Sequence, residues 1–384
     1  MTKYVKGLML PWLCARFDTE APVRAAANSA FSALFPPAKI ADALLFCKND
    51  IQLGLDTNIS HSVQTLCDPK LFSKEEAEDT LARVQASSLL VLAHVLEALP
   101  KDQAVKFSEG LEALHKPVFW KLVTNSSVHV RAAFYTAIRA LTVQAPSLLR
   151  DAPDSAGTSK LRLAGAAVVQ GLSDKEAAAH SQMWECILVF FRAFPEALAA
   201  LDLNKAVLPR LFTFVKCGAY GSSVDSFPCL VPFTDLCLRA APHVADKMHM
   251  GLLQGLWEAL AGFKSGRGSD EAPRAATVRA YFECLLHGWQ QCAAGVVGDV
   301  VVADDVVADR VLALSRDGLL PCVDVLLRPP RRGDACAKWE LEGTDHGLLT
   351  ATVKCIELLC CRDELAVARP SALKALVARL QCCP

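Results

Sequence analysis

The sequence predicts an all-α fold in which antiparallel helix pairs stack side by side. Three observations predict it: the composition, a motif that recurs along the chain, and prolines that recur within apolar helical segments. The 384 residues are 52% hydrophobic but only 7% aromatic, and their apolar positions follow helical spacing more than the alternation of strands. This length is enough for two ordinary domains or for one array whose core grows with each added unit.

The recurring motif is an Asp or Asn followed, five and six positions later, by a Val-Arg pair. Its two clear copies are Asp18, Val23 and Arg24, and Asn125, Val130 and Arg131. A fainter copy places Asp174 before Ala179 and His180 at the same offsets. We expect the Asp or Asn to cap the helix that follows, because its side chain accepts hydrogen bonds from free backbone N–H groups. The Val should then face a neighbouring helix, and the Arg should pair with an acidic cap in the same or the next copy.

Prolines interrupt apolar helical segments at Pro11, Pro117, Pro209, Pro232 and Pro321. A proline removes one backbone hydrogen bond and kinks a helix, and its recurrence in the first helix of a helix pair is typical of HEAT repeats. One copy of either feature would fit an ordinary amphipathic helix. Their recurrence favours a HEAT/armadillo-like α-solenoid over residues 1–384, stabilised as a sum over units and their interfaces.

Three segments rich in Pro, Gly, Ser and charge predict loops between helices, at residues 150–160, 264–274 and 328–338. The C-terminal third has the weakest helical pattern. Within it, Val296–Gly318 is rich in Val and Asp. Acidic residues interrupt this segment too often for a buried strand, so we expect a helix, although valine also favours strands.

Charge and cysteine usage favour a cytoplasmic protein. The net charge is −1, so no global field steers the chain toward nucleic acid or an anionic membrane, and contact with a polyanion would have to be regional. The 16 cysteines are scattered and no secretory signal opens the chain, which indicates a reducing compartment. The most apolar windows, such as Ser87–Pro100, are shorter than a bilayer requires, so no membrane is expected.

No catalytic or metal-binding motif is recognisable. No C-x-x-C occurs, and the nearest candidates are Cys355, Cys360, Cys361, Cys382 and Cys383. Adjacent cysteines on a helix point in different directions, so core packing is the favoured interpretation over a zinc site. Nothing in the sequence brings a cysteine nucleophile to a base such as His94, His115, His129 or His180. Phosphate-binding and hydrolase motifs are also absent, so no cofactor is expected.

The densest basic cluster is formed by Arg328, Arg331 and Arg332 on a proline-rich segment. Guanidinium groups bind phosphates in a bidentate manner, so this cluster is the candidate polyanion contact, with a solvated loop as the alternative. Tryptophans within helical patterns are better explained as core anchors than as platforms for bases. They are Trp12, Trp120, Trp184, Trp257 and Trp289.

Several ordered strings resemble the N-terminal HEAT region of the listerin family of large E3 ubiquitin ligases. The closest are Tyr4–Pro36, Leu44–Ile51 and Leu66–Leu99. Intermittent matches follow at Phe119–Tyr135, Ser173–Leu188, Phe227–Phe233 and Arg279–Leu286. The resemblance implies that the first repeats of the family and its C-terminal RWD and RING domains lie outside these 384 residues, so ubiquitin transfer is not assigned to any residue here.

The resemblance implies a docking arm in ribosome-associated quality control. Listerins anchor their N-terminal part on the large ribosomal subunit, through rRNA and ribosomal protein, beside the quality-control factor that binds the nascent chain. Their RING domain, which holds zinc, recruits the E2 enzyme so that stalled nascent chains are ubiquitinated. For this chain the resemblance therefore implies a cytosolic, ribosome-associated scaffold. The alternatives are a generic HEAT-repeat adaptor unrelated to ubiquitin and an independent enzyme.

Overall fold

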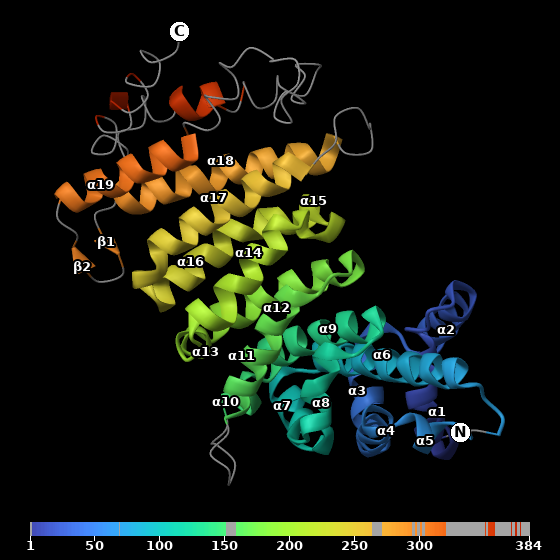
Figure 1. The fold of residues 1–384 in the computed structure, drawn as a ribbon. Coiled ribbons are helices and arrows are strands. Elements are labelled where there is room, and N and C mark those ends of the chain that lie inside the picture. The colour runs from blue at the N-terminus through green and yellow to red at the C-terminus, as the bar shows by residue number, and fades with distance from the viewer. Residues whose placement is uncertain are drawn as a thin grey trace. The chain divides into compact units, whose positions relative to one another are not determined.

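The computed structural model describes residues 2–68, 70–150, 159–262, 271–293, 296–297, 300–301 and 304–319, together with residues 350, 352–357, 370, 373–374 and 377. The chain divides into two compact units, Met1–Ala200 and Leu201–Pro384. Figure 1 shows helices throughout both units. The described residues therefore confirm the all-α fold class, whereas one solenoid over residues 1–384 stays a prediction.

The first unit consists of helices joined by short turns. Its α-helices are α1 (Thr2–Ala15), α2 (Ala21–Leu34), α3 (Pro37–Phe46), α4 (Lys48–Ser60), α5 (Val63–Leu66), α6 (Lys74–Ala98), α7 (Lys101–Glu109), α8 (Pro117–Lys121), α9 (Val128–Gln144), α10 (Pro146–Arg150), α11 (Lys160–Gln170), α12 (His180–Ala193) and α13 (Pro195–Ala199). Its 3-10 turns are Glu112–His115, Leu122–Thr124, Gly171–Ser173 and Ala177–Ala179.

The core of the first unit lies between α6, α9 and α12, with α6 against α9 and α9 against α12 (Figure 1). Helix α6 begins with a capping box, in which the Ser73 hydroxyl accepts from Glu76 N–H and the Glu76 carboxylate accepts from Ser73 N–H. Phe134 and Ile138 of α9 are fully buried. Stacking of this kind is what the recurring motif predicts for successive units.

Helix α6 is long and apolar enough to span a bilayer, judged by length and composition alone, and no other helix of the described residues passes that test. It extends well before the apolar window Ser87–Pro100, which is why the sequence window looked too short. Half of its most apolar 18-residue window is buried inside the fold. Because the apolar side of α6 lies against α4 and α9, it is explained as the core helix of this unit.

The second unit continues with helices of similar length. It contains a π-helical turn at Leu203–Val207, α14 (Leu208–Lys216), α15 (Ser223–Ser226), α16 (Leu230–Ala240), α17 (Ala245–Gly262), α18 (Glu271–Ala293), α19 (Asp304–Leu314) and a second π-helical turn at Ser315–Leu319. Its 3-10 turns are Phe227–Cys229 and Pro242–Val244. Helix α17 packs between α14 and α18 (Figure 1).

A left-handed turn joins α14 to α15. Gly218, Ala219, Tyr220 and Gly221 all have positive φ, at 61°, 51°, 50° and 95°. Two of them carry a Cβ, which makes this conformation costly by about 1–2 kcal/mol per residue. The turn is held by hydrogen bonds from Tyr220 N–H to Cys217 O and from Ser222 N–H to Ala219 O.

The helix predicted over Val296–Gly318 is wrong in its first part. The short strands β1 (Val296–Val297) and β2 (Val300–Val301) pair antiparallel there, and the helix α19 starts only at Asp304. The two Val pairs are separated in the sequence by Gly298 and Asp299, a combination that favours hairpin turns. The predicted loops fall largely on residues 151–158, 263–270 and 320–349, which lie outside the described residues.

The prolines occupy two kinds of position. Pro11 lies inside α1, as predicted. Pro117 and Pro209 instead lie in the first turns of α8 and α14, and Pro232 is the third residue of α16. A proline in the first turn costs no hydrogen bond, because the N–H it lacks has no partner within the helix. The prediction of a proline inside a helix is therefore wrong for Pro117. Pro209 and Pro232 follow the π-helical turn Leu203–Val207 and the 3-10 turn Phe227–Cys229 without a break, so the helix type changes just before each of them. Pro321 lies outside the described residues.

Candidate functional site

The recurring motif forms the same backbone arrangement in its two clear copies. The Oδ1 atom of Asp18 accepts a hydrogen bond from Glu20 N–H at 2.8 Å, and that of Asn125 accepts from Ser127 N–H at 2.9 Å. The cation six residues later then binds the main chain of the motif. Nη1 of Arg24 donates to Asp18 O at 2.7 Å, and Nη1 of Arg131 donates to Asn125 O at 2.8 Å.

The fainter copy has the same geometry with a histidine as the donor. Asp174 Oδ1 accepts from Glu176 N–H at 3.0 Å, and His180 Nε2 lies 3.0 Å from Asp174 O. Because a carbonyl oxygen only accepts, His180 carries a proton on Nε2. The spacing of six residues thus places a donor over the turn before the helix in all three copies.

Arg131 also joins its own copy to the next one. Its guanidinium donates to both carboxylate oxygens of Asp174, at 2.7 and 2.9 Å, and to Glu176 Oε1 at 3.0 Å. The side chains of Arg131 and Asp174 are only 10% and 3% exposed. Since α9 packs against α12, this buried bridge fixes the register between successive copies, a role that pairs of buried ions can fill.

The first copy is linked in a more exposed way. Arg83 of α6 donates to both oxygens of Asp18 at 3.1 Å, with side chains 53% and 21% exposed. The backbone hydrogen bond from Glu20, followed by Arg83, lowers the pKa of Asp18. The hydrogen bond to Asp174 is the main cause that raises the pKa of Arg131.

The expectation that the motif Asp or Asn caps the following helix is wrong in detail. Asp18 and Asn125 do not cap the helices: the N-cap residues of α2 and α9 are Glu20 and Ser127, and neither helix has a side-chain cap bond at that residue. Both motif side chains bind the N–H of the N-cap residue itself, so they order the turn before the helix.

The two motif valines also differ in burial. Val130 is fully buried, as expected for a residue that faces a neighbouring helix, but Val23 is 44% exposed. Helix α2 buries only Phe31 among its 14 residues, so its Val and Ala positions lie at the surface of the first unit. Spacing alone does not distinguish the two cases. Arg83 and Glu176, which complete the links, also lie outside the motif and were not predicted.

Two of the cysteines, Cys14 and Cys284, are not suited to nucleophilic catalysis. Burial raises the pKa of Cys14, and it raises that of Cys284 to about 12. Thiols of this kind stay protonated and are poor nucleophiles. His94 stacks on Phe17 and lies 3.2 Å from Arg16 Nη1, so it is part of the packing between α1 and α6.

No group of three His, Cys, Asp or Glu side chains within the described ranges is arranged to hold a metal ion. Cys355 is buried, whereas Cys360, Cys361, Cys382 and Cys383 lie outside the described residues. The basic cluster of Arg328, Arg331 and Arg332 also lies outside them, so its contact with a polyanion stays a prediction. Among the tryptophans, Trp120, Trp184 and Trp289 are buried as expected for core anchors.

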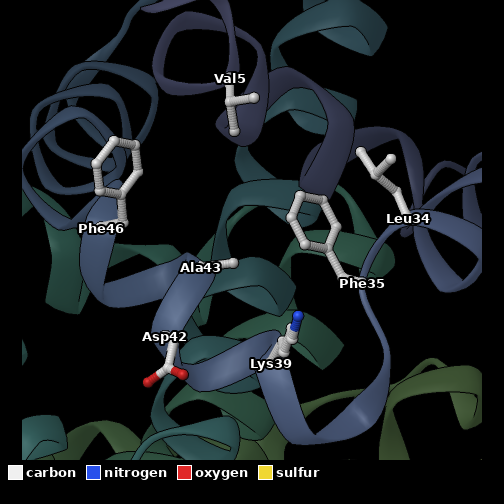
Figure 2. Close-up of a pocket in the computed structure, with 7 residues that line it drawn as sticks. All are labelled: Val5, Leu34, Phe35, Lys39, Asp42, Ala43 and Phe46. Atoms are coloured by element: carbon white, nitrogen blue, oxygen red, sulfur yellow. The ribbon is translucent and has the colours of Figure 1, made fainter. Parts of the chain in front are cut away.

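A pocket of about 500 Å³ lies between α1, α2 and α3. Figure 2 shows Val5 of α1 and Phe46 of α3 on one side, with Leu34 and Phe35 at the end of α2 on the other. The remaining lining residues come from α3: Lys39, Asp42 and Ala43. This lining is mainly apolar, and one Lys and one Asp do not form a nucleophile with a base. The pocket is thus suited to holding an apolar group.

The comparisons with known proteins decide the family. Residues 1–237, more than half of the chain, match the family described as E3 ubiquitin-protein ligase listerin, N-terminal domain. This chain belongs to the listerin family. Listerin of Mus musculus is 27% identical over 330 residues, which are 85% of this chain and 17% of the relative. Listerin of Xenopus tropicalis is 28% identical over 333 residues, which are 86% and 19%.

The listerin match covers both the Arg131–Asp174 bridge and the start of the second unit. The chain spans less than a fifth of the length of these listerins, so the activity of the whole ligase is not assigned to it by similarity. An engineered protein of solved structure aligns with 97% of the chain, but with a TM-score of 0.28 and 11% identity. That likeness carries no argument about the fold.

Proposed function

We propose that this chain is the N-terminal docking arm of a listerin-type E3 ubiquitin ligase, which anchors the ligase on the large ribosomal subunit so that stalled nascent chains are ubiquitinated. The observation that carries the proposal is the match to the listerin N-terminal domain over residues 1–237. Its partners are then rRNA and ribosomal protein of the large subunit and the quality-control factor that binds the nascent chain. Its place is the cytosol, on ribosomes, and no membrane is involved.

The architecture supports a scaffold role. Stacked helices joined by buried links such as Arg131–Asp174 keep distant parts of a surface in fixed relation, which a docking arm requires. The E2 enzyme would be recruited by a RING domain that is not part of this segment. Zinc is expected in that domain only, and no cofactor in this one. The family match favours this function over a generic HEAT-repeat adaptor unrelated to ubiquitin.

Co-sedimentation of the chain with purified large ribosomal subunits over a salt series tests the proposal. If docking uses phosphate contacts, binding should weaken steeply as salt rises, with a log–log slope that reports the number of phosphates neutralised. Absence of binding at low salt would contradict the proposal. Small subunits serve as the control particle, since they carry the same rRNA chemistry without the proposed site.

The candidate basic cluster gives a sharper comparison. Replacing Arg328, Arg331 and Arg332 together by Gln should lower the slope by up to about three if all three contact phosphates. The matched control replaces three exposed lysines by Gln: Lys74, Lys116 and Lys205. Equal losses in both triple variants would show that binding reflects general positive charge, and the assignment to the cluster would be wrong.

A further inference from the structure

Helices α16, α17 and α18 are joined by a file of polar side chains, in which two histidines are buried and the side chain of Asp235 is 39% exposed. His287 of α18 lies in the middle: its Nε2 is 2.9 Å from Asp235 Oδ1 on α16, and its Nδ1 is 3.1 Å from His249 Nε2 on α17. The file ends where His249 Nδ1 lies 2.9 Å from the carbonyl oxygen of Ala245. His249 and His287 are 3% and 7% exposed, so water does not substitute freely for the contact between the two rings.

The distances determine where the protons are. The Ala245 carbonyl only accepts, so His249 Nδ1 carries a proton, and His249 Nε2 is an acceptor while that ring is neutral. His287 Nδ1 must therefore donate to it. The remaining gap, between His287 Nε2 and the Asp235 carboxylate, also needs a proton. With Asp235 ionised, both nitrogens of His287 are protonated, and each of the three gaps holds one proton.

We propose that His287 is a buried imidazolium paired with Asp235, and that this proton is a switchable link that holds α16 to α17 and α18. If His287 loses a proton, two lone pairs face each other across 2.9 or 3.1 Å, and one of the two gaps becomes repulsive. If His249 gains one, two N–H groups face each other instead.

The surroundings agree with this assignment. Gln291 Nε2 lies 3.4 Å from Asp235 Oδ1 and 3.3 Å from His287 Nε2. Because both nitrogens carry protons in the proposed arrangement, both donate to the Asp235 carboxylate. Burial, followed by the charge of His287, lowers the pKa of His249 to about 4, which keeps that ring neutral as an acceptor. A Cβ at position 288 would lie 3.2 Å from His249 Cδ2, so Gly288 lets the two helices approach closely enough for the file to form.

Other ionisable groups on these helices have partners or environments of their own. On α17, Asp246 is paired with Arg310 of α19 at 3.2 Å. On α16, Arg239 is exposed. Burial raises the pKa of the nearby thiols, which stay neutral around pH 7: Cys237, Cys284 and Cys292.

Nitrogen NMR of the histidine rings in the intact chain, labelled at histidine, tests the proton count directly at pH 7. We expect both ring nitrogens of His287 to be protonated and His249 to be protonated at Nδ1 only, which is the less common form of a free neutral histidine. Signals are assigned with D235N, in which the introduced side-chain amide can donate to His287 Nε2. That variant fills all three gaps without charge, so His287 should lose its Nε2 proton while the fold is kept.

The pH dependence of urea unfolding gives an independent measurement. A free imidazole has lost its proton above about pH 6.5, so a proton retained on His287 in the folded state makes unfolding more favourable as pH rises. Between pH 7 and 8 the unfolding constant of the wild type should rise by up to about tenfold. In D235N only the part of the rise that the buried thiols cause should remain. The full rise should persist in the matched variant D246N, which removes a paired carboxylate that does not contact the file.

Either measurement can overturn the proposal. A single protonated nitrogen on His287 in the wild type at pH 7 would refute the imidazolium, and this result does not depend on any variant folding. A proton on His249 Nε2 would refute the direction of the file. An equal rise of the unfolding constant in wild type and D235N would show that the proton contributes nothing to the link. Buried thiols also favour unfolding at alkaline pH, and because D235N contains the same thiols, the difference between wild type and D235N isolates the contribution of the His287 proton.

Discussion

Replacing Arg131 by methionine is expected to destabilise the first unit by about 3–5 kcal/mol. The change leaves the Asp174 carboxylate, which is 3% exposed, without its cation, and removal of one partner of a buried ion pair costs this much because the other charge stays buried. Methionine retains much of the side-chain volume, so the loss reports charge and hydrogen bonds more than a cavity. Two carbonyl groups, of Asn125 and Ser126, lose their donor as well.

A second variant separates the cost of the unpaired Asp174 carboxylate from the cost of the other hydrogen bonds that Arg131 makes. R131M combined with D174N removes both charges, while the amide oxygen introduced by D174N can still accept the hydrogen bond from Glu176 N–H. The double variant should recover about 2 kcal/mol or more of the loss, because no uncompensated carboxylate remains. The matched control is R83M, which breaks the exposed pair with Asp18 and should cost about 0–1 kcal/mol.

Hydrogen exchange measured by mass spectrometry on peptides from α9 and α12 is the appropriate assay. It reports opening free energies locally, which matters in a chain with two compact units. The reasoning is refuted if R131M and R83M lower protection equally, or if the double variant is no more stable than R131M. In either case, burial of the Arg131–Asp174 ion pair would not determine how much it contributes to stability.

Four further outcomes are expected, two from glycine substitutions and two from the unchanged chain. Gly171→Ala should destabilise by about 1–3 kcal/mol, because its Cβ would meet a methionine side chain and a tyrosine hydroxyl at 2.9 Å. Gly165→Ala, whose nearest contact is 3.5 Å, should stabilise α11 by about 0.5–1 kcal/mol. Burial lowers the pKa of His94 to about 4, so its NMR titration should have a midpoint there. The exposed thiol of Cys217 should be alkylated much faster than buried Cys186, whose pKa burial raises.

Each of these outcomes has a direct check. Thermal unfolding compares the two glycine variants, and a similar shift in both would show that the close contacts relax freely. For His94, the folded state binds fewer protons than the unfolded one between about pH 4 and 6.5. Stability should therefore fall as pH decreases through that range, by up to about 1.4 kcal/mol per pH unit, and a flat profile in wild type would contradict the low pKa. Equal alkylation rates for the two cysteines would contradict their burial.

Sequence spacing predicted the helices and the repeated turn because both depend on local contacts. The offset of six residues from Asn125 to Arg131 places a donor over a turn that the same segment forms, so the motif could be recognised without any tertiary information. The offset does not say whether a valine is buried. Val23 and Val130 occupy equivalent positions, but only Val130 has a neighbouring helix over it.

The long-range partners could be predicted only in part. Arg131 pairs with Asp174 of the next copy across 43 residues, as the motif predicts for its Arg, but the repeat does not say that this pair is buried. His287 pairs with Asp235 across 52 residues, and neither of these two residues is part of a short motif. The same holds for the pocket of Figure 2, which is lined by three separate helices. The strands β1 and β2 were not predicted for a different reason. Acidic residues interrupt the valines and argue against a buried strand, but Gly-Asp between two Val pairs favours a short hairpin.

The bridge from Arg131 to Asp174 also bears on how the chain can be shortened. Residues 151–158 look like a natural place to end a recombinant fragment, because they separate α10 from α11 and are rich in Pro, Asp and Ser. A fragment that stops there keeps the guanidinium on α9 and loses its carboxylate. Boundaries placed after α13 retain both partners, and they are the ones to choose for crystallisation or for mapping which piece a ribosome retains.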